Sequence, residues 1–250
     1  MSYQAVFQRY EIKYMISRKQ KDILLQAMEP YMELDQYGHT TIRNIYYDTD
    51  NYRLIRRSIE KPAYKEKLRI RCYDQAAPDS TVFVELKKKY QDVVYKRRLS
   101  LTETEAMDWL SGSKHCGKNT QISAEIDYFL EYYKTLHPVV FLSYEREAFY
   151  AKDGSDFRVT FDENLLCRRN NLSLEADVWG IPLLEDDYIL MELKCSGAIP
   201  IWMVRILSQE HIYKTSFSKY GTAYQNIILP SQNRLYQGDL PYEHYFSRIV

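Results

Sequence analysis

No long apolar run is present in this chain. No stretch approaches the roughly 18 uncharged residues that a membrane span needs, and the N-terminal sequence MSYQAVFQR has no apolar signal core. We therefore expect a cytoplasmic protein without a membrane segment.

Cysteine, glycine and proline are all scarce. The 4 cysteines are scattered and form neither a C-x-x-C pair nor the spacing of a zinc site, so we expect reduced thiols. With only 8 glycines, 8 prolines and no low-complexity run, no linker is evident. We predict one domain over residues 1–230, followed by a C-terminal tail over residues 231–250.

A net charge is absent as well, because 34 Lys and Arg residues balance 34 Asp and Glu residues. A neutral chain has no global attraction for nucleic acid or for an anionic membrane, and we expect no nucleic-acid partner. Any site for a polyanion must therefore come from a local arrangement of charges.

Such an arrangement is present in several segments that alternate charged and apolar residues. A period of two is typical of strands, whose side chains point alternately to the two faces of a sheet. The alternation marks residues 9–14, 64–73, 81–90, 139–150, 156–162 and 189–195, and residues 96 and 98 continue it. The charged side of these strands carries Glu11, Lys13, Lys65, Lys67, Arg69, Arg71, Glu85, Lys87, Lys96, Arg98, Arg146, Arg158, Glu192 and Lys194.

Helical patterns separate these strands, which indicates an α+β fold with a largely antiparallel sheet. We expect helices over residues 18–31, 102–110, 121–134, 200–210 and 218–228, the second with Thr102 as its cap. The charged side holds 11 cations and only 3 acids. On an ordinary solvated face the cations would repel one another. We therefore predict a closed antiparallel β-barrel tunnel with a charged interior, decorated by helices that cover its apolar faces.

Nine short motifs, taken in order, make this chain similar to a known family. The motifs are RYEIKY (9–14), IYYDT (45–49), KLRIR (67–71), VELK (84–87), YKRR (95–98), YER (144–146), RVTFD (158–162), MELK (191–194) and FSKY (217–220). Together they resemble the triphosphate tunnel metalloenzymes, and specifically the catalytic domain of the vacuolar transporter chaperone family, which makes inorganic polyphosphate.

The resemblance implies a set of site residues. Catalytic roles are implied for Lys13, Arg69, Arg71, Arg146, Arg158 and Glu192. Phosphate binding is implied for Lys67, Lys87, Lys96, Arg98, Lys194 and Lys219. Glu192 is the leading ligand for Mn²⁺ or Mg²⁺, and Glu11 and Glu85 are further candidates.

Arg9 departs from the wider superfamily, which often has a glutamate at that position. Fewer carboxylates weaken the case for a hydrolase that activates water between two metal ions. The resemblance therefore implies a phosphotransferase that uses ATP or another nucleoside triphosphate to build inorganic polyphosphate. Three alternatives remain: a triphosphatase or tripolyphosphatase on the same tunnel, a non-catalytic module that binds polyphosphate or nucleotide, and an RNA-binding protein with an open basic sheet.

Overall fold

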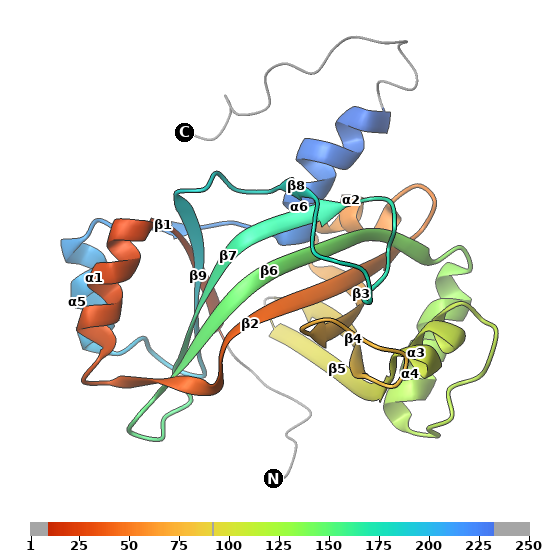
Figure 1. The fold of residues 1–250 in the computed structure, drawn as a ribbon, viewed down its shortest axis with the longest axis horizontal. Coiled ribbons are helices and arrows are strands. Elements are labelled where there is room, and N and C mark those ends of the chain that lie inside the picture. Colours follow the sequence, from red (N-terminus) through yellow and green to blue (C-terminus); the bar gives the residue numbers. More distant parts are fainter. Residues whose placement is uncertain (1–9, 92, 233–250) are drawn as a thin grey trace.

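The computed structural model describes residues 10–91 and 93–232, which form an antiparallel sheet with helices around it (Figure 1). The strands are β1 (Tyr10–Ser17), β2 (Met32–Asp48), β3 (Tyr64–Tyr73), β4 (Thr81–Tyr90), β5 (Val93–Thr102), β6 (His137–Ala151), β7 (Arg158–Arg168), β8 (Ile181–Pro182), β9 (Tyr188–Cys195) and β10 (Lys214–Thr215). The helices are α1 (Arg18–Met28), α2 (Arg53–Ile59), α3 (Glu103–Leu110), α4 (Gln121–Tyr133), α5 (Ile201–Gln209), α6 (Lys219–Ala223) and the π-helix η1 (Tyr224–Ile228). The predicted α+β class is confirmed.

The described strands form one ten-stranded sheet in the order β10-β1-β9-β7-β6-β2-β3-β4-β5, with β8 paired to β7. Among the described residues, no backbone pairing joins β5 to β1 or β10, so the sheet is open and the predicted closed barrel is not confirmed. At one end of the order, β10 has two residues, which pair with Lys13 and Tyr14 of β1.

Side chains, rather than backbone hydrogen bonds, connect the two ends of the open sheet. Lys87 Nζ on β4 lies 2.9 Å from Glu11 Oε2 on β1. Lys67 Nζ on β3 lies 3.0 Å from Ser218 Oγ, immediately before α6. The sheet therefore curls around an inner face, across which β1 and the start of α6 meet β3 and β4.

Helices cover the apolar outer side of the sheet, as the sequence predicts (Figure 1). Trp109 of α3 and Phe129 of α4 pack against β2 to β5. Leu24 of α1 and Met203 of α5 pack against β1, β7 and β9. The remaining core lies between β2, β6 and α6, where Tyr220 is 2% exposed. With the outer side covered in this way, charged side chains are left for the inner face.

Capping side chains set where three of the helices begin. Ser17, Thr102 and Thr120 each accept a hydrogen bond from the backbone N–H of the third helical residue. In return, the side-chain oxygen of that third residue accepts a hydrogen bond from the backbone N–H of the cap residue. Such reciprocal caps satisfy backbone donors that the first turn leaves unpaired. The cap predicted at Thr102 is confirmed.

The remaining expectations concern the thiols, the membrane and the two ends of the chain. All four cysteines are free thiols. Within the described part of the chain, no helix has both the length and the apolar character needed to cross a membrane. Arg9 and most of the predicted tail, from residue 233 onward, lie outside the described residues.

Candidate functional site

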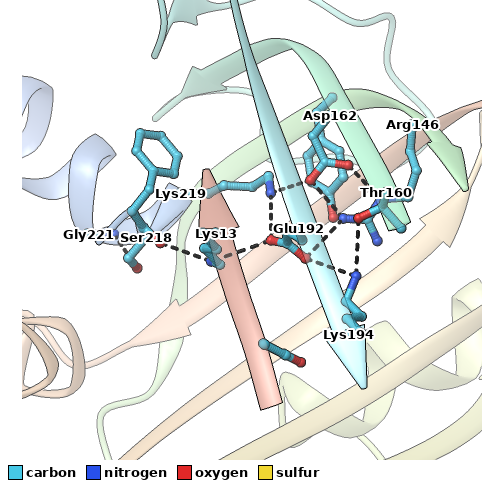
Figure 2. Close-up of polar contacts among 12 residues, drawn as sticks. Lys13, Arg146, Thr160, Asp162, Glu192, Lys194, Ser218, Lys219 and Gly221 are labelled. Atoms are coloured by element: carbon cyan, nitrogen blue, oxygen red, sulfur yellow. Dashed lines mark hydrogen bonds and ion pairs between the residues drawn. The ribbon is translucent and has the colours of Figure 1, made fainter. Parts of the chain in front are cut away.

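Glu192 of β9 is the centre of a group of charged side chains on the inner face (Figure 2). Its carboxylate oxygens lie 3.0 Å from Lys194 Nζ, 3.4 Å from Lys13 Nζ and 3.6 Å from Lys219 Nζ. Antiparallel pairing of β1 with β9 sets Lys13 directly opposite Glu192. We call the following six residues the Glu192 cluster: Lys13, Arg146, Asp162, Glu192, Lys194 and Lys219.

Asp162 of β7 is the second carboxylate of the Glu192 cluster, and it is fully buried. It accepts two hydrogen bonds from Arg146, at 2.6 and 2.7 Å, and one from Lys219 Nζ at 2.5 Å. This bidentate geometry fixes the plane of the guanidinium. Asp162 was not among the predicted site residues, although it lies on the same side of β7 as Arg158.

The Glu192 cluster carries an excess of positive charge, with four cationic side chains and two carboxylates. Burial by itself raises the pKa of Glu192, but attraction to Lys194 and Lys219 outweighs burial and holds the pKa well below its usual range. The carboxylate is therefore ionised at neutral pH, and the remaining positive charge favours an anion beside it.

A second charged group lies on β3, β4 and β5. Glu85 is 1% exposed, and its carboxylate lies 2.7 Å from Arg69, from Lys96 and from Arg98. We call these four residues the Glu85 cluster. Burial raises the pKa of Glu85, but Arg69 and Arg71 outweigh it and hold that pKa well below its usual range. This cluster also has more cations than acids.

Three lysines form a row across the same strands. The register pairs Lys67 of β3 with Lys87 of β4, and Lys87 with Lys96 of β5. Like charges directly opposite each other destabilise a sheet. Burial and repulsion from Lys13 and Lys87 lower the pKa of Lys67 to about 7. Glu11 compensates Lys87 and Glu85 compensates Lys96, whereas Lys67 contacts the neutral Ser218 hydroxyl. An anion beside Lys67 would therefore relieve the repulsion that lowers its pKa.

Arg71 is held by neutral groups instead of a carboxylate. Its guanidinium donates to Asn44 Oδ1 at 2.9 Å and to the Tyr144 hydroxyl at 2.9 Å, and the residue is only 6% exposed. Arg69 donates both to the neutral Tyr46 hydroxyl at 2.8 Å and to the Glu85 carboxylate. The neutral partners of Arg71 orient its guanidinium without cancelling its charge.

Arg158 is a predicted site residue that belongs to neither cluster. Its side chain is 43% exposed, and it pairs with Asp35 of β2 at 3.9 Å. Its position on β7 is opposite Lys194 of β9, so it lies on the charged side of the sheet but toward the edge of the Glu192 cluster.

The three predicted metal ligands do not form one cage. Glu11 pairs with Lys87, Glu85 belongs to its own cluster, and Glu192 is surrounded by other cations. In the described ranges, no group of three or more His, Cys, Asp or Glu residues is arranged to hold a metal ion. Mg²⁺ is commonly held by one or two carboxylates together with phosphate oxygens and water. Glu192, buried and ionised, fits an ion that brings such ligands with it.

Residues 217–220 link the site to the rest of the fold. The Phe217 carbonyl accepts a hydrogen bond from Lys13 Nζ at 2.9 Å, and Ser218 contacts Lys67. The Tyr220 hydroxyl donates to the buried carboxylate of Asp48 at 2.9 Å. The FSKY motif predicted Lys219 as a site residue. It did not predict the contacts of Phe217, Ser218 and Tyr220, because their partners lie far away in the sequence.

Most of the chain matches one family of known proteins. A family model described as the VTC domain matches residues 8–228. No curated protein matches the chain at a significant level.

Two solved structures share the fold at low sequence identity. One is a candidate adenylate cyclase from Bacillus halodurans, with a TM-score of 0.53 and 16% identity, covering 86% of this chain and 96% of that one. The other is a candidate adenylyl cyclase from Hippeastrum described as having a dominant triphosphatase activity, with a TM-score of 0.52 and 14% identity, covering 94% of this chain and 98% of that one. At such identities the likeness supports the fold alone.

Proposed function

Since the chain belongs to the VTC domain family, we propose that it is a metal-dependent phosphoryl transferase that builds inorganic polyphosphate from a nucleoside triphosphate. The observation that carries the proposal is the excess of cations on the inner face. Both clusters hold more cations than carboxylates, and Lys67 lies opposite Lys87 with the neutral Ser218 hydroxyl as its hydrogen-bond partner, so a polyphosphate chain would supply negative charge that the face lacks.

Phosphoryl transfer depends mostly on positioning the reactants and on neutralising the charge of the phosphate oxygens. Arg69, Arg71 and Arg146 are held by fixed partners and would offer planar donors to particular phosphates. Lysines would act as point charges along a chain that changes register. The proposed phosphate contacts are Lys13, Lys67, Arg69, Arg71, Lys87, Lys96, Arg98, Arg146, Lys194 and Lys219, with Arg158 reaching only the end of a long chain.

Glu192 is the proposed ligand for Mn²⁺ or Mg²⁺, together with phosphate oxygens of the substrate. The bound ion would add positive charge at the phosphate that is transferred. Glu11 is a second candidate from the opposite strand, β1. Glu85, enclosed by three cations, is better placed to orient them than to bind a metal.

Transfer onto polyphosphate suits these residues better than hydrolysis. Both acids of the Glu192 cluster are already paired with cations, so neither is available to take a proton from water. A terminal phosphate oxygen is already anionic and needs no base. The chemistry of the acceptor therefore favours a polymerase over a triphosphatase.

The proposal is tested by incubating the protein with ATP and Mn²⁺ and following ADP, free phosphate and polyphosphate in parallel. We expect ADP and polyphosphate to accumulate together, and to do so equally in Glu125→Gln, whose carboxylate pairs with Arg97 and Lys88 outside the two clusters. Free phosphate without polymer would instead indicate a triphosphatase. No turnover, combined with a melting temperature raised by tripolyphosphate, would indicate a binding module.

A further inference from the structure

Three aromatic side chains gather at one end of the charged inner face. The rings of Tyr37 and Tyr73 lie nearly parallel with their centroids 6.5 Å apart, and the Phe83 ring meets Tyr73 edge-on at 5.8 Å. We call these three residues the aromatic platform. Tyr37 is 68% exposed and Tyr73 is 43% exposed. The hydrophobic core of the described chain contains none of the three, so packing of the core does not account for them.

The aromatic platform lies on the charged side of β3 and β4. Tyr73 follows Arg69 and Arg71 at alternate positions of β3, and Phe83 of β4 lies directly opposite Arg71. Side chains on one face of a strand follow one another at intervals of about 7 Å. A ligand with one end on Tyr73 can therefore extend past Arg71 and then reach Arg69.

Arg98 of β5 joins the aromatic platform to the Glu85 cluster. Its guanidinium lies 4.1 Å from the centre of the Phe83 ring, donates to the Tyr73 hydroxyl at 3.0 Å and donates to Glu85 at 2.7 Å. Burial raises the pKa of Tyr73, but attraction to Arg98 and Arg71 outweighs burial and lowers that pKa. The platform therefore lies within the positive field of the residues that are proposed to bind phosphate.

Tyr37 reaches Tyr73 because β2 is irregular at this point. The register of β2 against β6 shifts across residues 35–38. Within this segment the Asp35 carboxylate accepts a hydrogen bond from the Tyr37 backbone N–H at 3.0 Å, and Gly38 has a positive φ of 57°, which favours glycine. Local contacts thus hold the Tyr37 backbone in place, while its ring stays exposed beside Tyr73.

Exposed rings next to a cationic groove are suited to a ligand that has both a flat ring and phosphates. Proteins that bind single-stranded nucleic acid combine these two parts, with aromatic rings stacking on the bases and a positive groove following the phosphates. Arginine beside the rings adds a further attraction to a π-system. An inorganic phosphate chain has no apolar surface with which to cover the platform, whereas the base of a nucleotide has one.

We propose that the aromatic platform binds the base of the donor nucleotide by stacking, with the triphosphate extending from Tyr73 past Arg71 into the charged face. This inference rests on the proposed function, which supplies the nucleoside triphosphate, and it adds the place where the nucleoside lies. Stacking accepts every base, because each has a π-face. A purine covers more of a ring than a pyrimidine does, so the site takes purine nucleotides in preference.

The test is calorimetric titration of ATP and of tripolyphosphate into the full chain and into Tyr37→Leu, without a divalent metal so that neither ligand is turned over. Leucine keeps an apolar side chain but has no flat ring. We expect Tyr37→Leu to bind ATP about 10-fold more weakly, within the range usual for one base stacked on an aromatic ring. Its affinity for tripolyphosphate should equal that of the unmodified protein, and Tyr37→Trp should restore the ATP affinity.

Tyr128→Leu is the matched control. Tyr128 is also 68% exposed, and its ring also stacks on a second tyrosine, Tyr132, with centroids 6.3 Å apart. It lies on α4, which covers the outer side of the sheet, so we expect this variant to bind ATP and tripolyphosphate as the unmodified protein does.

Other nucleotides test the mode of binding. GTP should lose as much affinity as ATP in Tyr37→Leu, and UTP should lose less. A loss confined to ATP would show that the site recognises adenine by specific contacts, and would overturn stacking as the source of the affinity.

The outcomes also separate this inference from the proposed function. Unchanged ATP affinity in Tyr37→Leu, or an equal loss for ATP and tripolyphosphate, overturns the base site and leaves the phosphate-binding face standing. Absence of tripolyphosphate binding by the unmodified protein contradicts the proposed function instead. ATP binding that still weakens in Tyr37→Leu would in that case support the base site alone.

Discussion

At Glu192 a single carboxylate contacts cations that come from four elements of the fold: β1, β6, β9 and α6. Breaking a buried charge group by removing one member is costly, because the other charges remain without compensation. The same change also increases the positive charge that an anionic ligand meets. Stability and anion binding should therefore respond in opposite directions at this residue.

We predict that Glu192→Gln lowers the melting temperature, keeps or tightens tripolyphosphate binding, and abolishes turnover that depends on a divalent metal. The amide keeps the shape of the side chain but loses the negative charge that attracts the neighbouring lysines and would attract a metal ion. Thermal melts, calorimetric titration and product analysis measure the three effects. Full metal-dependent activity in this variant would exclude Glu192 as the metal ligand.

Lys67 should make tripolyphosphate binding depend on pH. Its pKa is about 7 in the free protein because of burial and nearby cations, and a bound anion favours the charged amine and raises that pKa. Binding above pH 7 therefore takes up a proton, and the affinity falls as the pH rises from about 7.

The proton uptake is measured by calorimetry at pH 8 in buffers of different ionisation enthalpy. Lys67→Arg is the matched variant, because a guanidinium stays charged across this range. We expect this variant to take up fewer protons than the unmodified protein. Protons exchanged by the ligand and the buffer are the same in both titrations, so subtracting one uptake from the other leaves the contribution of Lys67. Equal uptake in the two proteins would show that Lys67 is charged before the ligand binds.

At the residue scale, alternation predicted which side chains share the charged face, but not which of them pair. Arg69, Lys96 and Arg98 all enclose Glu85, which follows from the registers of β3, β4 and β5. Asp162 was missed as a site residue for the same reason, since its partner Arg146 lies on a different strand.

At the scale of elements, α6 is anchored by a contact outside the charged clusters. Tyr220 donates to Asp48, a fully buried carboxylate that also accepts from the backbone N–H groups of Leu54 and Ile55 at the start of α2. Because Lys219 precedes Tyr220, this anchor fixes where the lysine enters the Glu192 cluster.

We predict that Tyr220→Phe lowers the stability by about 1.5–3 kcal/mol, the usual value of a hydrogen bond to a charged group. The ring remains to pack against Tyr46, so the change removes the hydroxyl alone. Denaturant unfolding measures the loss, and Tyr213→Phe is the control because Tyr213 is 75% exposed. Equal losses in the two variants would show that the Asp48 contact contributes nothing specific.

Many of the elements were predictable from sequence. Periodicity, with the cap at Thr102, indicated five helices and the strands that alternate charged and apolar residues, and the structure confirms them. The long strand β2 and the two-residue strands β8 and β10 were not predicted, and neither was α2. Helix α2 was missed because it is short and its N-cap residue, Tyr52, has a positive φ of 57° and makes no side-chain cap hydrogen bond. Asp48, at the end of the preceding strand, accepts from the first-turn N–H groups of Leu54 and Ile55 instead.

At the scale of the whole molecule, alternation indicates the faces of a sheet but not how the sheet closes. Closure depends on backbone pairing between strands at opposite ends of the order, here β5 and β10, which no local pattern encodes. The described structure replaces that pairing with side-chain contacts such as Lys87 with Glu11. Such ion pairs are easier to rearrange than a β-ladder, and the proposed function requires a phosphate chain to enter between them.

The most direct test of the central claim, that the inner face binds a chain of phosphates, is calorimetric titration of tripolyphosphate into three proteins. We expect binding by the unmodified protein, an affinity weaker by about 1–3 kcal/mol in Arg69→Ala, and no change in Arg205→Ala, which removes an exposed arginine of α5. Arg158→Ala should show a smaller loss than Arg69→Ala, because its side chain is 43% exposed. Equal affinity in Arg69→Ala and the unmodified protein, with both folded, would contradict the account.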